Sequence, residues 1–151
     1  MRRIGKDEVS VMNVQITITG TQTLDGASET TRLSATGRME RDGDAWVLTY
    51  AESAESGMDG VTTQIRAGRD RAEIRRSGAL NSRLLLEEGG RHLCRYDTGY
   101  GFLQLGVHTH RVENRLEEGS GQLRLHYTLE LEGGAAARQE LLLEVARPEG
   151  A

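Results

Sequence analysis

The feature that most constrains this chain is a two-residue alternation of apolar and polar side chains, which recurs at strand length along the sequence. The clearest case lies near the C-terminal end, where leucine or tyrosine occupies every odd position from Leu123 to Leu131 and polar residues occupy the even ones. Successive side chains of a strand point to opposite faces, so the apolar side chains lie on a buried face and the polar ones on a face exposed to solvent. The sequence therefore predicts antiparallel β-structure.

Glycine-containing segments separate the alternating stretches. The chain has 19 glycines and a single proline, and pairs such as Asp42-Gly43 and Gly89-Gly90 stand where one stretch gives way to the next. Glycine readily adopts the positive φ that tight hairpin turns require. We expect Gly20 to Gly26 to form the first turn. The predicted strands are 14–19, 30–41, 46–50, 61–66, 72–77, 80–87, 92–98, 102–115 and 123–131.

The segment from Ala135 to Arg147 is ambiguous. Its opening run of three alanines, followed by Arg138, Gln139 and Glu140, has high helix propensity. On propensity alone, strand and helix are equally supported.

These elements predict an all-β chain that forms one antiparallel up-and-down barrel of 8–10 strands. No proline-rich linker or shift in composition divides the 151 residues, so the domain is expected to span 1–151, with flexible ends at 1–10 and 148–151. The connections are too short for parallel crossovers. Closure of the sheet into a barrel would also remove its unpaired edges.

Four short motifs in a fixed order strengthen this fold. They are Arg-Ser-Gly-Ala at 76–79, Tyr-Asp-Thr-Gly-Tyr-Gly at 96–101, Leu-Gln-Leu-Gly-Val-His-Thr at 103–109, and the alternating run at 121–129. In order and spacing the chain resembles the YwiB-like family of uncharacterised bacterial proteins, a domain-of-unknown-function family with a calycin-like, lipocalin-like barrel. The resemblance implies a bacterial cytoplasmic barrel and favours a strand at 137–147. It implies no activity, substrate or catalytic residue.

Composition narrows the classes of partner. The net charge of -4 argues against a general nucleic-acid binder, and a single cysteine excludes an internal disulfide or a cysteine-built zinc site. There is no apolar run of membrane-spanning length and no secretory signal, so we expect a cytoplasmic protein without a membrane partner. Eighteen of the 19 basic residues are arginine, which fits either a compositional bias or bidentate recognition of anions.

Histidine and cysteine offer two further candidates for chemistry. His108 and His110 share a face at strand spacing, and His126 follows on the next strand, but the alternation turns all three outward. Cys94 shares a face with His92, although no third residue that would orient a nucleophilic pair is evident. We therefore expect no metal site, no catalytic residue and a buried structural thiol. The glycine pairs lack the context of a nucleotide-binding fingerprint, so no cofactor is expected.

Arg76 is the residue that most suggests a binding site. If Ala72 and Ile74 face inward, strict alternation turns Arg76 inward too, where a guanidinium can hold a carboxylate or phosphate. A bulge that turns it outward, or an internal acid that pairs with it, would be the structural alternatives. By the same pattern, the other candidate pocket residues are Trp46, Tyr50, Tyr96, Thr98, Thr109 and Tyr127.

Three functions fit this reading, in a definite order. The first is a non-enzymatic barrel that binds a small, acidic or amphipathic molecule in its interior. The second is an interaction module, such as a homodimer, with a filled interior. An enzyme ranks last, because the sequence shows no catalytic geometry.

Overall fold

A computed structural model describes residues 11–97, 100–131, 134 and 136–148. The predicted flexible end at 1–10, and most of the one at 148–151, lie outside these residues. The described part of the chain contains ten strands and one short 3-10 turn. In chain order they are β1 (Val11–Leu24), β2 (Ala27–Asp42), β3 (Ala45–Ala51), η1 (Ala54–Ser56), β4 (Val61–Ala67), β5 (Arg71–Gly78), β6 (Asn81–Glu87), β7 (Arg91–Asp97), β8 (Phe102–Glu117), β9 (Ser120–Leu131) and β10 (Ala136–Ala146).

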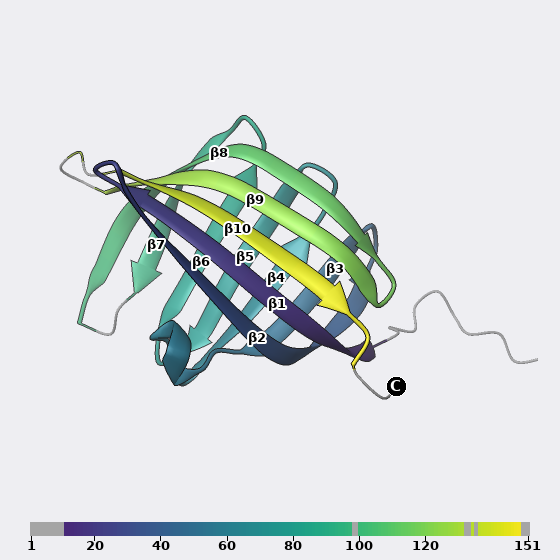
Figure 1. Cartoon of the computed structure of the whole chain (residues 1–151). Helices are drawn as coiled ribbons and strands as arrows, with labels where there is room; N and C mark the ends of the chain where they lie inside the picture. Colours follow the sequence, from purple (N-terminus) through teal and green to yellow (C-terminus); the bar gives the residue numbers. More distant parts are fainter. Residues whose placement is uncertain (1–10, 98–99, 132–133, 135, 149–151) are drawn as a thin grey trace, which may run out of the picture.

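The strands form a closed antiparallel barrel in which each strand pairs with its neighbour in the chain (Figure 1). Pairing of β1 with β10 closes the sheet, over a register from Gln15↔Ala146 to Thr23↔Arg138. The predicted all-β, up-and-down barrel is therefore confirmed. The described residues contain one helical segment, a 3-10 turn of three residues, which is neither long nor apolar enough to cross a membrane.

β10 resolves the ambiguous C-terminal segment as a strand. It is hydrogen-bonded to β1 on one side and to β9 on the other. Leu143 and Val145 are buried at alternate positions, in the manner of a strand with one face in the core. Partners on both edges and a half-buried pleated face outweigh the helix propensity of the alanines.

The first turn is shorter than the prediction of Gly20 to Gly26. β1 continues through Gly20, which pairs with Thr31 and Leu141, and the turn consists of Asp25 and Gly26 alone. Both turn residues have positive φ, 52° and 80°, as a two-residue hairpin connection prefers. The extra strand residues matter for the site described below, because they carry Gln22 and Leu24 to the end of the barrel.

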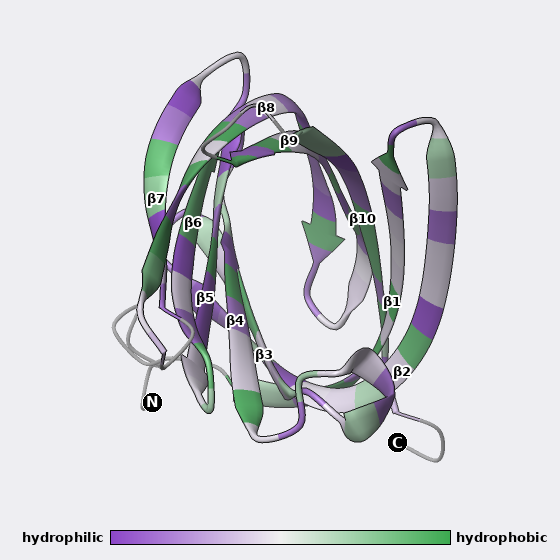
Figure 2. Ribbon diagram, turned by 90° about the vertical axis from the view of Figure 1, so that its left-hand side faces the viewer, coloured by the Kyte–Doolittle hydropathy of each residue, from purple (hydrophilic) through white to green (hydrophobic). Residues whose placement is uncertain are grey.

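The interior is densely packed through the middle of the barrel and toward one end. In an up-and-down barrel, successive connections alternate between the two ends. We call one the packed end; it carries the connections at 43–44, 68–70, 88–90 and 118–119. We call the other the open end; it carries those at 25–26, 52–60 and 79–80. Figure 2 shows apolar and polar bands alternating along the strands. The largest fully buried apolar side chains are Ile16, Met39, Leu48, Ile65, Ile74, Leu86, Leu123, Leu125 and Leu143.

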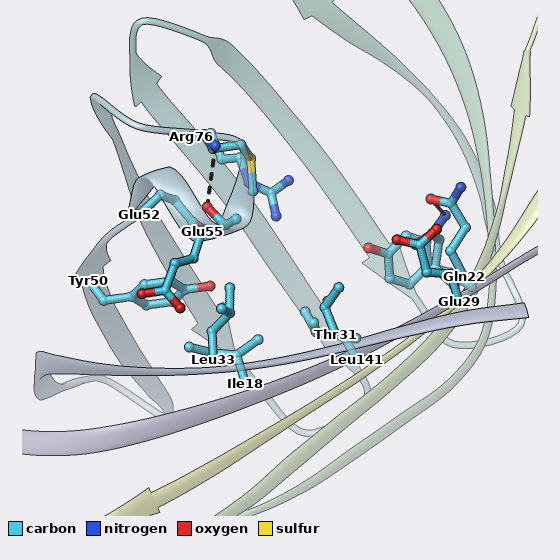
Figure 3. A pocket seen from close by; sticks show the side chains of 15 residues that line it. Ile18, Gln22, Glu29, Thr31, Leu33, Tyr50, Glu52, Glu55, Arg76 and Leu141 are labelled. Atoms are coloured by element: carbon cyan, nitrogen blue, oxygen red, sulfur yellow. Dashed lines mark hydrogen bonds between the residues drawn. The ribbon is translucent and has the colours of Figure 1, made fainter.

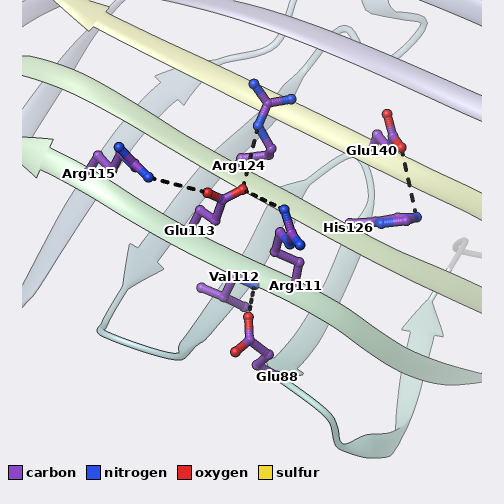
Figure 4. Close-up of polar contacts among 8 residues, drawn as sticks. All are labelled: Glu88, Arg111, Val112, Glu113, Arg115, Arg124, His126 and Glu140. Carbon is purple, nitrogen blue, oxygen red and sulfur yellow. Dashed lines mark hydrogen bonds and ion pairs between the residues drawn. The ribbon is translucent and has the colours of Figure 1, made fainter.

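One irregularity changes which residues of β8 face inward. A bulge between Thr109 and Arg111 shifts the register, so that the buried positions pass from Val107 and Thr109 to Val112. Just after the bulge, the Val112 amide donates to a Glu88 carboxylate oxygen at 2.8 Å (Figure 4). A side chain from the β6–β7 connection thus satisfies a backbone group of the bulged strand.

The outward face of β8 and β9 carries surface ion pairs. Glu113 lies within 3.3 to 3.9 Å of the guanidinium groups of Arg111, Arg115 and Arg124 (Figure 4). The three arginines are all well exposed, so these pairs contribute little to stability.

Gly37, in the middle of β2, allows two strands to approach closely. A Cβ added there would lie 2.5 Å from the Thr49 carbonyl oxygen and 2.8 Å from Ile16 Cδ1, whereas at Gly20 the nearest atoms are 3.7 Å away or more. Gly37→Ala should therefore lower the free energy of unfolding by about 1–3 kcal/mol. Gly20→Ala, the matched control, should leave it unchanged or raise it by up to about 1 kcal/mol. Chemical denaturation measures both, and equal effects would contradict this account.

Candidate ligand-binding site

A cavity of about 290 Å³ lies at the open end of the barrel (Figure 3). Strands β1, β2, β3, β5, β9 and β10 and the segment around η1 all contribute to its wall. Its lining combines charged groups, hydroxyls and apolar side chains: Ile18, Gly20, Gln22, Glu29, Thr31, Leu33, Tyr50, Glu52, Glu55, Ser56, Met58, Arg76, Tyr127, Gln139 and Leu141. The interior is thus filled toward the packed end and hollow at the open end.

Arg76 faces into this cavity, as the alternation of β5 predicts. Its Nε is buried and has no hydrogen-bond partner. The guanidinium makes no ion pair with any residue in the described part of the chain. The outward arginines on the same sheet differ, since Arg75 and Arg83 both pair with Glu73, at 3.3 and 2.7 Å. Arg76 is therefore a cation that lines a cavity without an ion-pair partner in the described part of the chain.

Arg76 belongs to a row of polar side chains that runs around the inside of the barrel. Cross-strand pairing places Tyr50 opposite Thr63, Thr63 opposite Arg76, Arg76 opposite Ser82, and Ser82 opposite Tyr96. Paired residues of an antiparallel sheet share a face, so these five residues form one polar belt across β3 to β7. Ser82 Oγ, like Arg76 Nε, is buried without a partner.

Glu52 extends the polar belt toward the mouth. Its carboxylate accepts a hydrogen bond from the Thr63 hydroxyl at 2.6 Å. Burial raises the pKa of Tyr50 well above its usual range, and the negative charge of Glu52 and a hydrogen bond to it raise that pKa further, against a smaller opposing effect of Arg76. Tyr50 thus stays protonated between a carboxylate and a guanidinium.

Tyr127, which also lines the cavity, behaves similarly. Burial raises the pKa of its hydroxyl, and the positive charge of Arg76 opposes that effect. Two tyrosine hydroxyls therefore lie within electrostatic reach of Arg76 as neutral groups. Neutral hydroxyls can donate to an anion at the guanidinium.

A second, apolar pocket of about 320 Å³ adjoins the first at the open end. The two share Gln22 and Gln139, whose side-chain amides are hydrogen-bonded at 3.0 Å. The remaining lining is Leu24, Tyr96, Leu103, Leu105, Leu129, Leu131, Ala136 and Ala137. The mouth of the barrel thus has a polar side and an apolar side.

The structure brings together only some of the residues that the sequence suggested. Arg76, Tyr50 and Tyr127 line the polar cavity, while Tyr96 lines the apolar pocket.

The other three candidates lie elsewhere. Trp46 lies four residues before Tyr50, roughly 13 Å nearer the packed end at the rise of a strand, and Arg41 covers its ring at 4.7 Å. Thr109 is fully buried and lines neither pocket. Thr98 lies outside the described residues.

Sequence reasoning did not identify Gln22, Glu29 and Glu52 as cavity residues. Gln22 lies beyond Gly20, where the first strand was expected to end, although the even positions of β1 continue to face inward. Glu52 lies two residues after Tyr50, so continued alternation turns its side chain toward the interior as well. Continuing the alternation past Gly20 and Ala51 would have found both residues.

His108, His110 and His126 lie on the outside of the barrel, as predicted. The rings of His108 and His110 are 4.6 Å apart, and those of His110 and His126 are 5.0 Å apart. Desolvation lowers the pKa of His110, and the charges of His108 and His126 lower it further. Within the described ranges, no group of three or more His, Cys, Asp or Glu residues is arranged to hold a metal ion. Cys94 is a buried free thiol, as expected.

Comparisons with known proteins agree with the observed architecture. The chain superimposes on the crystal structure of the ywiB protein from Bacillus subtilis with a TM-score of 0.82 and 18% identity, over 91% of this chain and 93% of that chain. At this identity the likeness shows the fold alone. A search of the curated proteins finds no match. The model of a family described as a domain of unknown function, DUF1934, matches residues 16–143, and the chain therefore belongs to that family.

Proposed function

We propose that the protein is a non-enzymatic binding barrel, which holds a small acidic molecule with an apolar part at its open end. The observation that carries this proposal is Arg76, whose buried Nε lacks a partner in a cavity of about 290 Å³. A buried guanidinium nitrogen without a hydrogen-bond partner is costly, and a bound carboxylate or phosphate offsets that cost with charge-assisted hydrogen bonds.

The surrounding residues support an acid that also has an apolar portion. Tyr50 and Tyr127 supply neutral hydroxyls near the guanidinium. Ile18, Leu33 and Leu141 supply an apolar wall in the same cavity, as small-molecule sites usually do.

Self-association is the second candidate, and it rests on a different observation. Several large apolar side chains at the open end are exposed, with Phe102 at 57%, Leu103 at 51%, Leu131 at 44% and Leu24 at 41%. Leu24, Leu103 and Leu131 line the same apolar pocket, and clustered exposed apolar groups are typical of interaction surfaces. Native mass spectrometry of protein purified from cells separates the two candidates, because it reports a retained small molecule and the mass of the assembly together.

Arg76→Met tests the binding proposal. The substitution removes an unpaired polar group from a partly buried position, so the ligand-free protein should gain about 1 kcal/mol of stability. Binding of an acidic ligand should weaken roughly 10- to 150-fold, which corresponds to the loss of a charged hydrogen bond. Native mass spectrometry and chemical denaturation give the two readouts.

Arg75→Met is the matched control, because its side chain points outward one residue away. It should retain the ligand. An Arg76→Met protein that loses stability and keeps its co-purified ligand would show that Arg76 is a structural residue.

The raised pKa values of the cavity tyrosines predict a loss of stability in alkali. Folding opposes ionisation of Tyr50, so this stabilisation is complete below the unfolded-state pKa of about 10 and is lost as pH rises above it. Tyr50→Phe should make the fall in stability between about pH 9 and about pH 11 smaller. Tyr100→Phe, at a fully exposed tyrosine, should leave that fall unchanged. Denaturation curves at the two pH values decide the matter, and an identical fall in both variants would contradict the prediction.

A further inference from the structure

We infer that the ligand carries an ammonium group next to its acidic group, as an apolar α-amino acid does. The inference rests on the proposed function and narrows the class of molecule that the polar cavity takes. Its basis is a pair of opposite charges, Arg76 and Glu52, that line the same cavity without forming an ion pair.

Arg76 and Glu52 are close neighbours that do not neutralise one another. Thr63 lies beside both residues, since it is the cross-strand partner of Arg76 and its hydroxyl donates to Glu52 at 2.6 Å. Yet no ion pair within 4.0 Å joins them, and the Glu52 carboxylate is held by the hydroxyl of Thr63 instead. Direct pairing would be the simplest way to offset two charges that are partly removed from water. A dipolar group in this cavity would offset both charges at once, with its anion toward Arg76 and its cation toward Glu52.

The balance of charge in the lining points the same way. Three carboxylates, Glu29, Glu52 and Glu55, share the cavity with a single guanidinium. Figure 3 shows Glu52 and Glu55 near Tyr50, and Glu29 beside Gln22 on the other side of the cavity. A purely anionic ligand would meet more negative than positive charge there. An ammonium group makes the ligand complementary to the carboxylates as well as to Arg76.

The apolar part of the lining suggests what else the ligand carries. Ile18, Leu33 and Leu141 lie together across the cavity from Arg76 (Figure 3). A molecule whose charged groups contact Arg76 and Glu52 would direct its remaining atoms toward these side chains. An α-amino acid with an aliphatic side chain has all three parts on one carbon atom, which suits a cavity of about 290 Å³.

Three probes with the same branched apolar end separate the contributions. Leucine carries both charged groups, isocaproate carries the carboxylate alone, and isoamylamine carries the ammonium alone. Titrations of the full chain, followed by calorimetry and by backbone amide NMR shifts, should give leucine an affinity at least about 10-fold above either analogue. Amide shifts should concentrate on the strands that carry Tyr50 and Arg76.

Glu52→Gln tests the role assigned to the carboxylate, since the amide oxygen can still accept the Thr63 hydroxyl and so maintain the fold. This variant should bind leucine no better than isocaproate, with its affinity for isocaproate unchanged or increased. Glu117→Gln, at an exposed position on β8, should keep the preference for leucine and serves as the control.

The outcomes also separate this inference from the proposed function. Binding of isocaproate as tight as that of leucine would overturn the ammonium requirement and leave the acid-binding proposal intact. If none of the probes binds at millimolar concentration, the inference fails. The Arg76→Met comparison by native mass spectrometry then decides the proposed function independently, because it does not depend on these probes.

Discussion

Closure of the sheet by the β1–β10 pairing is the constraint on which the rest of this structure depends. Because the first and last strands hydrogen-bond to each other, all ten strands turn one face toward a common interior. Any polar residue at an inward position is then enclosed with every other one. Pairing of the consecutive strands β3 to β7 forms the polar belt, and closure adds β1, β9 and β10 to the wall of the cavity that Tyr50 and Arg76 line.

The interior is divided lengthwise into two kinds of environment. Toward the packed end, fully buried residues such as Leu48, Ile65 and Ile74 fill the barrel. Toward the open end, the same inward positions carry Arg76, Glu52 and Gln22, and a cavity replaces close packing. Buried atoms without partners, such as Arg76 Nε and Ser82 Oγ, reduce the stability of the ligand-free barrel. Of these two residues, Arg76 lines the cavity at the open end.

Much of the barrel, and the inward direction of Arg76, follow from local pattern. The alternation of β5 turns Arg76 into the interior, and that of β9 does the same for Tyr127, because a strand has a fixed period of two. Other parts depended on where strands end. Gly20 reads as a turn residue, yet β1 passes through it and brings Gln22 to the cavity. Trp46 is on the same face of β3 as Tyr50 but lies toward the packed end. Alternation specifies which face of the sheet a side chain is on, but not where along the barrel axis it lies.

The sequence by itself determined the strands, their order and the faces they bury, because alternation and glycine turns are local properties of the chain. The tertiary structure decided that the sheet closes, where each inward residue lies along the barrel axis, and which charged side chains form ion pairs. The strand conformation of Ala136–Ala146 depends on partners at both edges, which no local propensity contains. That Arg76 and Glu52 face one cavity without pairing depends on the register of three strands at once. The cavity wall joins residues of β1, β9 and β10 to residues of β3 and β5, and strands so far apart in the sheet share one wall only when the sheet closes.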